Sequence, residues 1–174
     1  MVALLFPHQK QALDLLTKRY GAALFMDMGA GKTRTALEDL AKPDRLPALV
    51  LVKSSLVHHW REEARKWIPW IPVIPLSAKI PFRLRRPILQ RKNVIITCSF
   101  DLFKRIPPPK DGWQFKTVVA DESTLLKNHK AARTKAAKRV FRSAKWRRIL
   151  SGFPAPEGIL DLWSQYDLIC PGLL

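Results

Sequence analysis

The sequence predicts an α/β domain in which helices cover both faces of a mostly parallel β-sheet. Short apolar runs of strand length alternate with helical segments along the 174 residues. These runs are apolar at nearly every position, which is typical of strands buried on both faces of a parallel sheet. The segments with recognisable chemistry directly follow such runs, and open α/β sheets bind ligands at the carboxyl ends of their strands.

Hydrophobic periodicity, glycine and proline place the individual elements. The predicted strands are residues 22–26, 48–52, 73–76, 93–97, 117–120 and 148–150. The predicted helices are residues 7–20, 33–40, 56–67, 131–142 and 158–169. Two further stretches, the basic and proline-interrupted residues 81–92 and the proline-rich residues 106–110, are expected on the surface outside the core.

Length and composition point to one domain that spans residues 1–174, with a hydrophobic content of 47% that suffices for a sizeable core. Cys98 and Cys170 stand far apart in apolar surroundings, which fits two buried thiols in a reducing compartment better than a disulfide framework or a zinc site. No run approaches the roughly 20 apolar residues of a membrane span, and the first residues lack the pattern of a signal peptide. We therefore expect a soluble, intracellular protein.

The charge is strongly unbalanced, with 31 lysines and arginines against 14 acidic residues and a net charge of +17. Nucleic acid is the commonest partner of such a protein, and an anionic membrane surface is the second candidate. No basic helix has the broad apolar face that membrane-surface binding needs. One acid-free stretch carries ten cations: Lys127, Lys130, Arg133, Lys135, Lys138, Arg139, Arg142, Lys145, Arg147 and Arg148. We expect many of them on the solvent face of the helix 131–142, and a merely solvated face is the alternative.

Residues 26–33, which read M-D-M-G-A-G-K-T and are called the phosphate loop below, follow a predicted strand and begin a predicted helix. This context is the one that a P-loop requires. Gly29 and Gly31 let successive backbone N–H groups point at phosphate oxygens, and the helix N-terminus adds partial positive charge. We expect Lys32 to reach the β- and γ-phosphates and the Thr33 hydroxyl to bind magnesium. Met26 stands where the general pattern has its first glycine, and the alternative is a glycine-rich turn that merely ends in Lys-Thr.

Asp121 and Glu122, the acidic pair, follow the predicted strand 117–120. A P-loop site needs a carboxylate that holds magnesium through water and a group that orients or deprotonates the attacking water. We assign the first role to Asp121 and the second to Glu122. The alternative is a polar strand end with two solvated acids.

Six motifs occur in one order: P-H-Q, M-G-A-G-K-T, V-L-V-K-S-S-L-V-H-H-W, I-T-C-S-F-D, A-D-E-S-T-L-L-K-N and L-S-G-F-P-A-P. The series resembles the first RecA-like lobe of superfamily 2 helicases and translocases, above all the Swi/Snf-type branch with its short phage and bacterial relatives. The resemblance implies a RecA-like P-loop domain, ATP and Mg²⁺ as ligands, and DNA as partner. It further implies mainly backbone contacts to double-stranded DNA, and the cytoplasm of a bacterial or phage-infected cell.

The resemblance assigns roles to particular residues. It implies nucleotide contacts by Gln9, which would read the adenine edge, and by Gly29, Ala30, Gly31, Lys32 and Thr33. It implies catalysis by Lys32, Asp121 and Glu122, with Thr33 and Asp121 toward the metal. For nucleic acid it implies Ser54, Ser55 and Ser99, to which the basic helix adds Arg133, Lys138 and Arg142. Residues 151–154, the coupling segment, match the motif that couples nucleotide state to nucleic acid.

Two departures bear on coupling. Ser123 and Thr124 stand where the wider family often has alanine and histidine, and Phe153 replaces a usual threonine. That histidine helps to link hydrolysis to the coupling motif. The family's arginine finger, which can be worth about 10³–10⁵ in rate, belongs to a second lobe, so we expect this chain alone to bind ATP weakly and hydrolyse it slowly or not at all. A separate second lobe or another protein is then a partner. The alternative is a stand-alone nucleic-acid- or protein-binding protein, an inhibitor or adaptor, with a vestigial nucleotide site.

Aromatic and histidine side chains give weaker signals. Trp60, Trp67 and Trp163 lie in amphipathic helices and are expected to pack in the core, whereas Trp70, Trp113 and Trp146 are left open. His58 and His59 lack a third ligand at useful spacing and are interpreted as helix residues. Ser55 is also a candidate helix N-cap.

Overall fold

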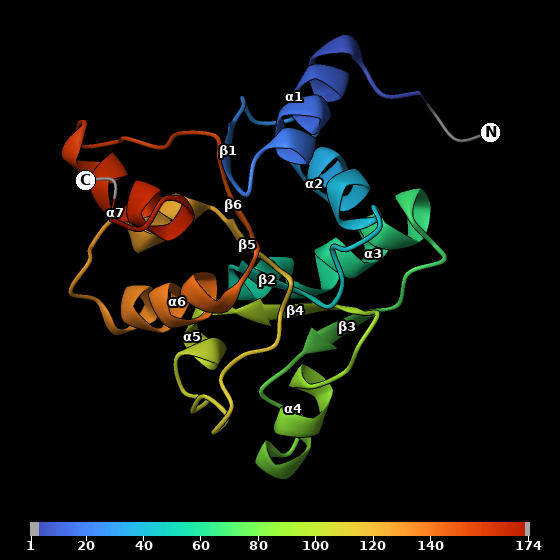
Figure 1. Ribbon diagram of the computed structural model, residues 1–174, viewed down its shortest axis with the longest axis vertical. Coiled ribbons are helices and arrows are strands. Elements are labelled where there is room, and N and C mark those ends of the chain that lie inside the picture. The colour runs from blue at the N-terminus through green and yellow to red at the C-terminus, as the bar shows by residue number, and fades with distance from the viewer. Residues whose placement is uncertain (1–3, 173–174) are drawn as a thin grey trace.

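The computed structural model describes residues 4–172, so the first three and last two residues of the predicted domain 1–174 lie outside the description. Six parallel strands form one sheet in the order β1-β6-β5-β2-β4-β3 (Figure 1). They are β1 (Gly21–Phe25), β2 (Ala48–Val52), β3 (Val73–Leu76), β4 (Ile95–Ser99), β5 (Thr117–Asp121) and β6 (Trp146–Ser151). The predicted α/β class with a parallel sheet is confirmed.

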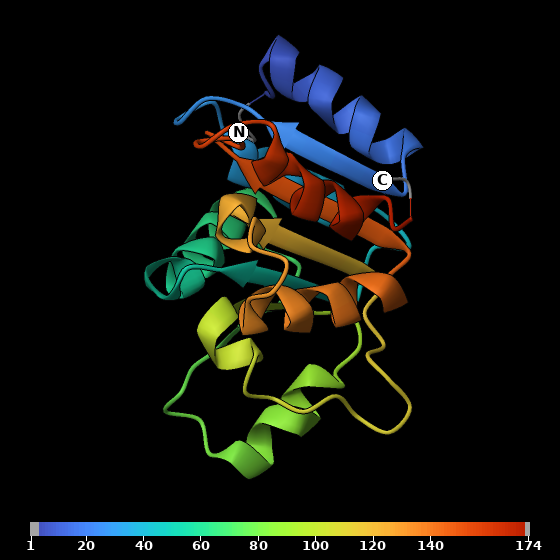
Figure 2. The ribbon, with the colours of Figure 1, turned by 90° about the vertical axis from the view of Figure 1, so that its left-hand side faces the viewer.

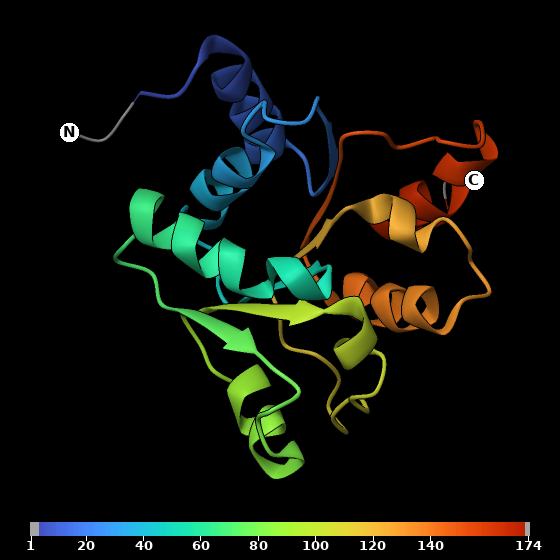
Figure 3. The ribbon, with the colours of Figure 1, turned by 180° about the vertical axis from the view of Figure 1, so that it is seen from behind.

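Helices cover both faces of the sheet (Figures 2 and 3). One layer holds α1 (Pro7–Lys18), α2 (Lys32–Leu40), η1 (Ser54–Leu56) and α3 (Val57–Trp67). The other holds α5 (Phe100–Phe103), η2 (Ser123–Leu126), α6 (Ala132–Ser143) and α7 (Leu160–Ile169). The remaining helix, α4 (Phe82–Leu89), lies beyond the β3 edge of the sheet (Figure 1).

The strands are apolar throughout because each of their faces packs against a separate core. On β2, Leu49 and Leu51 join the cluster under α5, α6 and α7, whereas Val50 and Val52 join the cluster under α2 and α3. Every residue of β2, β4 and β5 is buried. A two-sided core of this kind explains the continuous apolar runs that the sequence shows.

Several boundaries differ from those predicted. β4 covers Ile95–Ser99 instead of residues 93–97, and within it the Thr97 hydroxyl donates to the Val57 carbonyl at 2.9 Å inside the core. α5 was not predicted, and Ser99 caps it by accepting from the Leu102 N–H at 3.1 Å. α1 ends at Lys18 and α7 begins at Leu160, each two residues inside its predicted range.

Residues 81–92 are more regular than expected. Residues 82–89 form α4 with Pro87 inside it, and Leu89 is buried in the core instead of on the surface. The Arg85 guanidinium donates to the carbonyls of Ile80 and Ala78, at 2.9 and 2.8 Å, which ties the helix to the preceding turn. The rest of this stretch is surface, as predicted.

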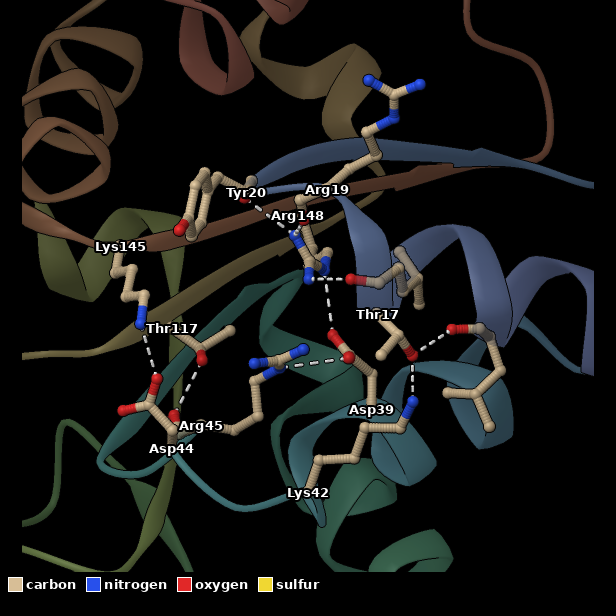
Figure 4. A network of polar contacts seen from close by, with 12 residues as sticks. Thr17, Arg19, Tyr20, Asp39, Lys42, Asp44, Arg45, Thr117, Lys145 and Arg148 are labelled. Atoms are coloured by element: carbon tan, nitrogen blue, oxygen red, sulfur yellow. Dashed lines mark hydrogen bonds and ion pairs between the residues drawn. The ribbon is translucent and has the colours of Figure 1, made fainter.

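The amino end of the sheet holds a buried ionic network (Figure 4). Asp39 accepts from Arg148 at 2.9 Å and from Arg45 at 3.1 Å, and all three side chains are almost fully buried. The Arg148 guanidinium also donates to four backbone carbonyls, those of Leu16, Arg19, Tyr20 and Arg147. β6 begins at Trp146, two residues before the predicted start, and Arg148, one of the ten cations of the acid-free stretch, is a core residue.

Candidate functional site at the carboxyl end of the sheet

The predicted site segments meet at one edge of the sheet. Because all six strands are parallel, the loops after β1, β6, β5, β2 and β4 emerge on the same side. In that spatial order they carry the phosphate loop, the coupling segment, the acidic pair, Ser54 with Ser55, and Ser99. Residues that are far apart in the chain are therefore neighbours at this edge.

The phosphate loop has the backbone conformation that its glycines allow. Gly29 and Gly31 both lie at φ +81°, a left-handed region that strains other residues. The Lys32 ammonium donates to the carbonyls of Met26 and Asp27, at 2.8 and 3.0 Å, so the loop curls around it. Met26 has no positive φ, and its replacement of the first glycine therefore adds no backbone strain.

Gln9 on α1 forms a hydrogen bond to the backbone of this loop. Its side chain is buried, its Oε1 accepts from the Phe6 N–H at 3.0 Å, and its Nε2 donates to the Ala30 carbonyl at 3.3 Å. A Cβ at Gly31 would collide with the Gln9 amide nitrogen, so any other residue would have to displace the Gln9 side chain and also adopt a strained positive φ. Gln9 therefore contacts the loop backbone in this structure, and its reading of adenine stays a prediction.

The acidic pair combines a buried carboxylate with a strained backbone. Burial raises the pKa of Asp121, although the Trp60 indole N–H, which donates to its Oδ2 at 2.9 Å, opposes the shift. The Glu122 charge raises this pKa further and the Lys32 charge lowers it. Glu122 lies at φ +58° and ψ +58°, an uncommon conformation for a residue with a side chain. A desolvated carboxylate with few compensating partners suits a site that receives a cation.

A polar link that the sequence did not reveal joins the acidic pair to the coupling segment. The Ser123 hydroxyl donates to Gln165 Oε1 on α7 at 2.6 Å, and Gln165 Nε2 donates to the Pro154 carbonyl at 2.7 Å. Both side chains are fully buried. The available signal was a glutamine on the buried side of α7, next to the equally buried Ser164, but its partners lie 11 and 42 residues away in the chain.

Two of the three serines predicted to contact nucleic acid, Ser54 and Ser99, line one hollow. A cavity of about 170 Å³ is lined by Ser54, His58, Ser77 and Ser99, among others. Ser54 and Ser55 are exposed, while Ser99 is buried. The N-cap assignment of Ser55 was wrong, because η1 precedes α3 and puts Leu56 at the N-cap without a side-chain hydrogen bond.

Only some of the cations on the basic helix α6 are exposed and without an acidic partner among the described residues. Arg142 is exposed and Arg133 is half-buried. Lys138 pairs with Asp167 at 2.7 Å and lies 5.0 Å from the centre of the Trp163 ring, so its charge is already compensated. Its expected position on an open face was therefore wrong, because α7 packs alongside α6 and supplies this carboxylate.

Tryptophan burial follows the predictions in part. Trp60 is fully buried, whereas the prediction of core packing for Trp163 was wrong, since 41% of it is exposed. Its ring lies against His129 and Lys138 at the surface. Of the tryptophans left open, Trp113 and Trp146 are buried and Trp70 is exposed.

Within residues 4–172, no group of three His, Cys, Asp or Glu residues is placed to hold a metal ion. His58 and His59 are residues of α3, as predicted. Cys98 is a buried free thiol, and burial raises its pKa to about 12. Cys170 is a free thiol that is only half-buried, contrary to expectation. None of the described helices is long and apolar enough to span a membrane.

Comparison with known proteins decides the family. A model of the SNF2-related domain matches residues 8–174. The chain belongs to this family. It is 34% identical over 173 residues to the SWI/SNF-related matrix-associated actin-dependent regulator of chromatin subfamily A-like protein 1 of Xenopus laevis, an alignment that covers 98% of the chain and 18% of that relative. It is 31% identical over 189 residues to the TATA-binding protein-associated factor mot1 of Aspergillus fumigatus, with coverage of 97% and 10%.

The fold of this SNF2-related domain is shared with a solved structure. The Sulfolobus solfataricus SWI2/SNF2 ATPase core in complex with double-stranded DNA matches with a TM-score of 0.81 and 27% identity, over 100% of the chain and 37% of that structure. This confirms the RecA-like architecture and the resemblance to a Swi/Snf-type ATPase lobe. The chain thus spans only a minor part of its relatives. These include an uncharacterized ATP-dependent helicase of Mycoplasma pneumoniae, 34% identical over 162 residues, of which the chain covers 15%.

Proposed function

We propose that residues 1–174 are a single RecA-like lobe that binds ATP with Mg²⁺ and grips double-stranded DNA, as the first lobe of a Swi/Snf-like translocase or helicase. The observation that carries the proposal is the meeting of Lys32, the acidic pair and Gly152 at one sheet edge. A Cβ at Gly152 would lie 3.6 Å from Lys32 Nζ, so the coupling segment touches the phosphate loop. Family membership supports the use of ATP and Mg²⁺.

In this proposal the phosphate loop holds the nucleotide and the acidic pair serves the metal and the water. The backbone N–H groups of residues 29–31 and the Lys32 ammonium bind phosphate oxygens, and Gln9 contacts the base. Thr33 and Asp121 hold Mg²⁺, which when bound neutralises phosphate charge. Glu122 orients or accepts a proton from the attacking water. The partly compensated, buried carboxylate of Asp121 is the observation that fits a cation.

DNA contact is proposed through backbone phosphates. Ser54 and Ser99 line the hollow at the carboxyl edge, and Ser55 is exposed beside Ser54. On α6, Arg142 adds an exposed charge and Arg133 a half-buried one. Lys138 joins them only if its ion pair with Asp167 opens. The solved relative from Sulfolobus is a complex with double-stranded DNA, which supports the choice of duplex over other partners.

Nucleotide binding is the decisive test of this function. We expect wild-type protein to bind AMP-PNP with Mg²⁺ in calorimetry and Lys32→Ala to lose most of that affinity. Lys18→Ala is the matched control, since Lys18 is exposed at the opposite end of the sheet, where it forms a surface ion pair with Asp14. Undetectable binding by the wild type would favour the adaptor or inhibitor with a vestigial nucleotide site.

Hydrolysis and DNA binding test the remaining parts. We expect slow turnover from this chain alone and faster turnover when a second lobe is added, because the arginine finger can be worth about 10³–10⁵ in rate. Turnover near that of DNA-stimulated relatives would contradict this. We also expect DNA affinity to fall steeply with salt and to vary little with sequence. A flat salt dependence would remove the electrostatic basis of the proposal.

A further inference from the structure

Gln165 on α7 stands between the two segments that the proposed site uses. Its Oε1 accepts from Ser123, which directly follows the acidic pair, and its Nε2 donates to Pro154, which ends the coupling segment. The second hydrogen of Nε2 goes to the Asp161 carbonyl at 2.8 Å. Gln165 and Ser123 are both 0% exposed, so no water competes for these bonds.

The orientation of the Gln165 amide is fixed by its partners. The carbonyls of Pro154 and Asp161 can only accept, so both must face the NH₂ group. The Oε1 atom therefore faces Ser123, and the Ser123 hydroxyl must be the donor. A side chain of another type, including glutamate, cannot satisfy one donor and two acceptors in this geometry.

Each end of this link leads to a part of the nucleotide site. Ser123 adjoins Glu122, whose left-handed backbone needs neighbours that hold it in place. Pro154 is two residues from Gly152, where a Cβ would lie 3.3 Å from Met28 and 3.6 Å from Lys32 Nζ. A shift of either the acidic pair or the coupling segment therefore has to move or break the Gln165 bonds.

We propose that Gln165 is a positioning residue that, through Ser123, couples the acidic pair to the coupling segment. This rests on the proposed function, and it gives the chain a route that replaces the histidine absent at Thr124. Ser123, which departs from the alanine common in the wider family, is then the hydrogen-bond donor that Gln165 requires. Coupling of this kind is reciprocal: nucleotide changes the affinity for DNA by the factor by which DNA changes the affinity for nucleotide.

The test measures that factor in the full chain. We would determine the affinity for a fluorescein-labelled mixed-sequence DNA duplex with and without saturating Mg²⁺–AMP-PNP, and the affinity for AMP-PNP without DNA. For the wild type we expect the nucleotide to change DNA affinity about fivefold or more. For Ser123→Ala and Gln165→Met we expect that change to vanish while AMP-PNP affinity without DNA stays within about twofold.

Ser164→Ala is the matched control. Ser164 is an equally buried hydroxyl on α7 that donates to the Leu126 carbonyl of η2 at 2.8 Å but contacts neither the acidic pair nor the coupling segment. We expect it to keep the coupling. We also expect the Ser123→Ala/Gln165→Met double variant to lose no more coupling than either single variant, because both break one link.

The outcomes separate this inference from the function on which it rests. Loss of AMP-PNP or DNA binding by the wild type overturns the proposed function. Binding of both ligands without mutual influence overturns only the coupling role, as does a Ser123→Ala protein that keeps the wild-type factor. An equal loss in Ser164→Ala would reduce Gln165 to ordinary packing and also overturn the inference. Thermal melts show which variants fold. If Gln165→Met does not fold, the result for Ser123→Ala, the mildest change, decides the test.

Discussion

At the amino end of the sheet the buried carboxylate of Asp39 has two guanidinium partners, whereas at the carboxyl end the buried carboxylate of Asp121 has an indole N–H and a backbone N–H. The two groups are similarly buried, at 1% and 7% exposure. Full positive charges compensate the first, and only neutral donors contact the second directly. The domain therefore pairs the buried carboxylate at one end of its sheet with its own cations and leaves the buried carboxylate at the other end without a directly paired cation.

This difference separates structural from functional use of buried charge. Breaking a compensated buried pair costs stability, because it leaves a charge without a partner. A buried carboxylate without a cationic partner lowers the stability of the fold, and binding of a cation beside it would raise that stability. We therefore expect changes at the amino end to act on folding and changes at the carboxyl end to act on ligand-dependent behaviour.

The largest expected effect is that of Arg148→Met at the amino end. This change leaves Asp39 with Arg45 alone and removes the donor for four carbonyls, so we expect unfolding to become easier by about 3–5 kcal/mol. Urea denaturation measures it. The control is Arg147→Met on the same strand, since the Arg147 Nε has no hydrogen-bond partner among the described residues. Equal losses in the two variants would contradict a special role for the network.

The next effect sharpens the contrast from the other end. If the carboxyl end is a ligand site, Mg²⁺–AMP-PNP at about 100 times its Kd should stabilise the wild type by about 2.7 kcal/mol. Lys32→Ala should show far less of this gain, while Arg148→Met should keep it in full on a lower baseline. The measurement is denaturation with and without the nucleotide. A gain that depends on Arg148 would mean that the two ends are not independent.

A pH dependence distinguishes the two carboxylates further. Because the pKa of Asp121 is raised in the folded protein, the unfolded chain releases this proton first, and stability falls as pH rises from the unfolded to the folded pKa. Asp121→Asn cannot titrate, so its advantage over the wild type should grow across that window, by about 1.4 kcal/mol for each unit of pKa difference. Denaturation between acidic and neutral pH tests this. A constant difference would show that Asp121 ionises normally.

The sequence predicted the carboxyl end better than the amino end, for a physical reason. The phosphate loop and the acidic pair are local patterns, in which neighbouring residues together state the chemistry. Arg148 and Gln165 carry no such signal, because their partners lie up to 132 and 42 residues away and only the folded sheet brings them together. Apolar runs in the sequence indicate buried strands, and they placed most of the six strands well. The same criterion ended β4 too early, because the polar residues Thr97 and Ser99 are buried through hydrogen bonds that an apolar pattern cannot indicate.

The smallest expected effect compares the backbone at the two ends. Glu122 and Asp44 both have positive φ, of 58° and 71°. Asp44 binds Lys145 and Lys116, whose hydrogen bonds lower its pKa to about 2, while no ion pair holds Glu122 among the described residues. Glycine at position 122 should therefore relieve strain and stabilise the protein by up to about 1 kcal/mol, whereas Asp44→Gly should gain less because it gives up its ion pairs. Denaturation of both variants decides the matter. A destabilised Glu122→Gly protein would mean that the Glu122 side chain stabilises the fold by more than its backbone strain costs. Glu122 would then serve folding, contrary to the separation of a structural amino end from a functional carboxyl end.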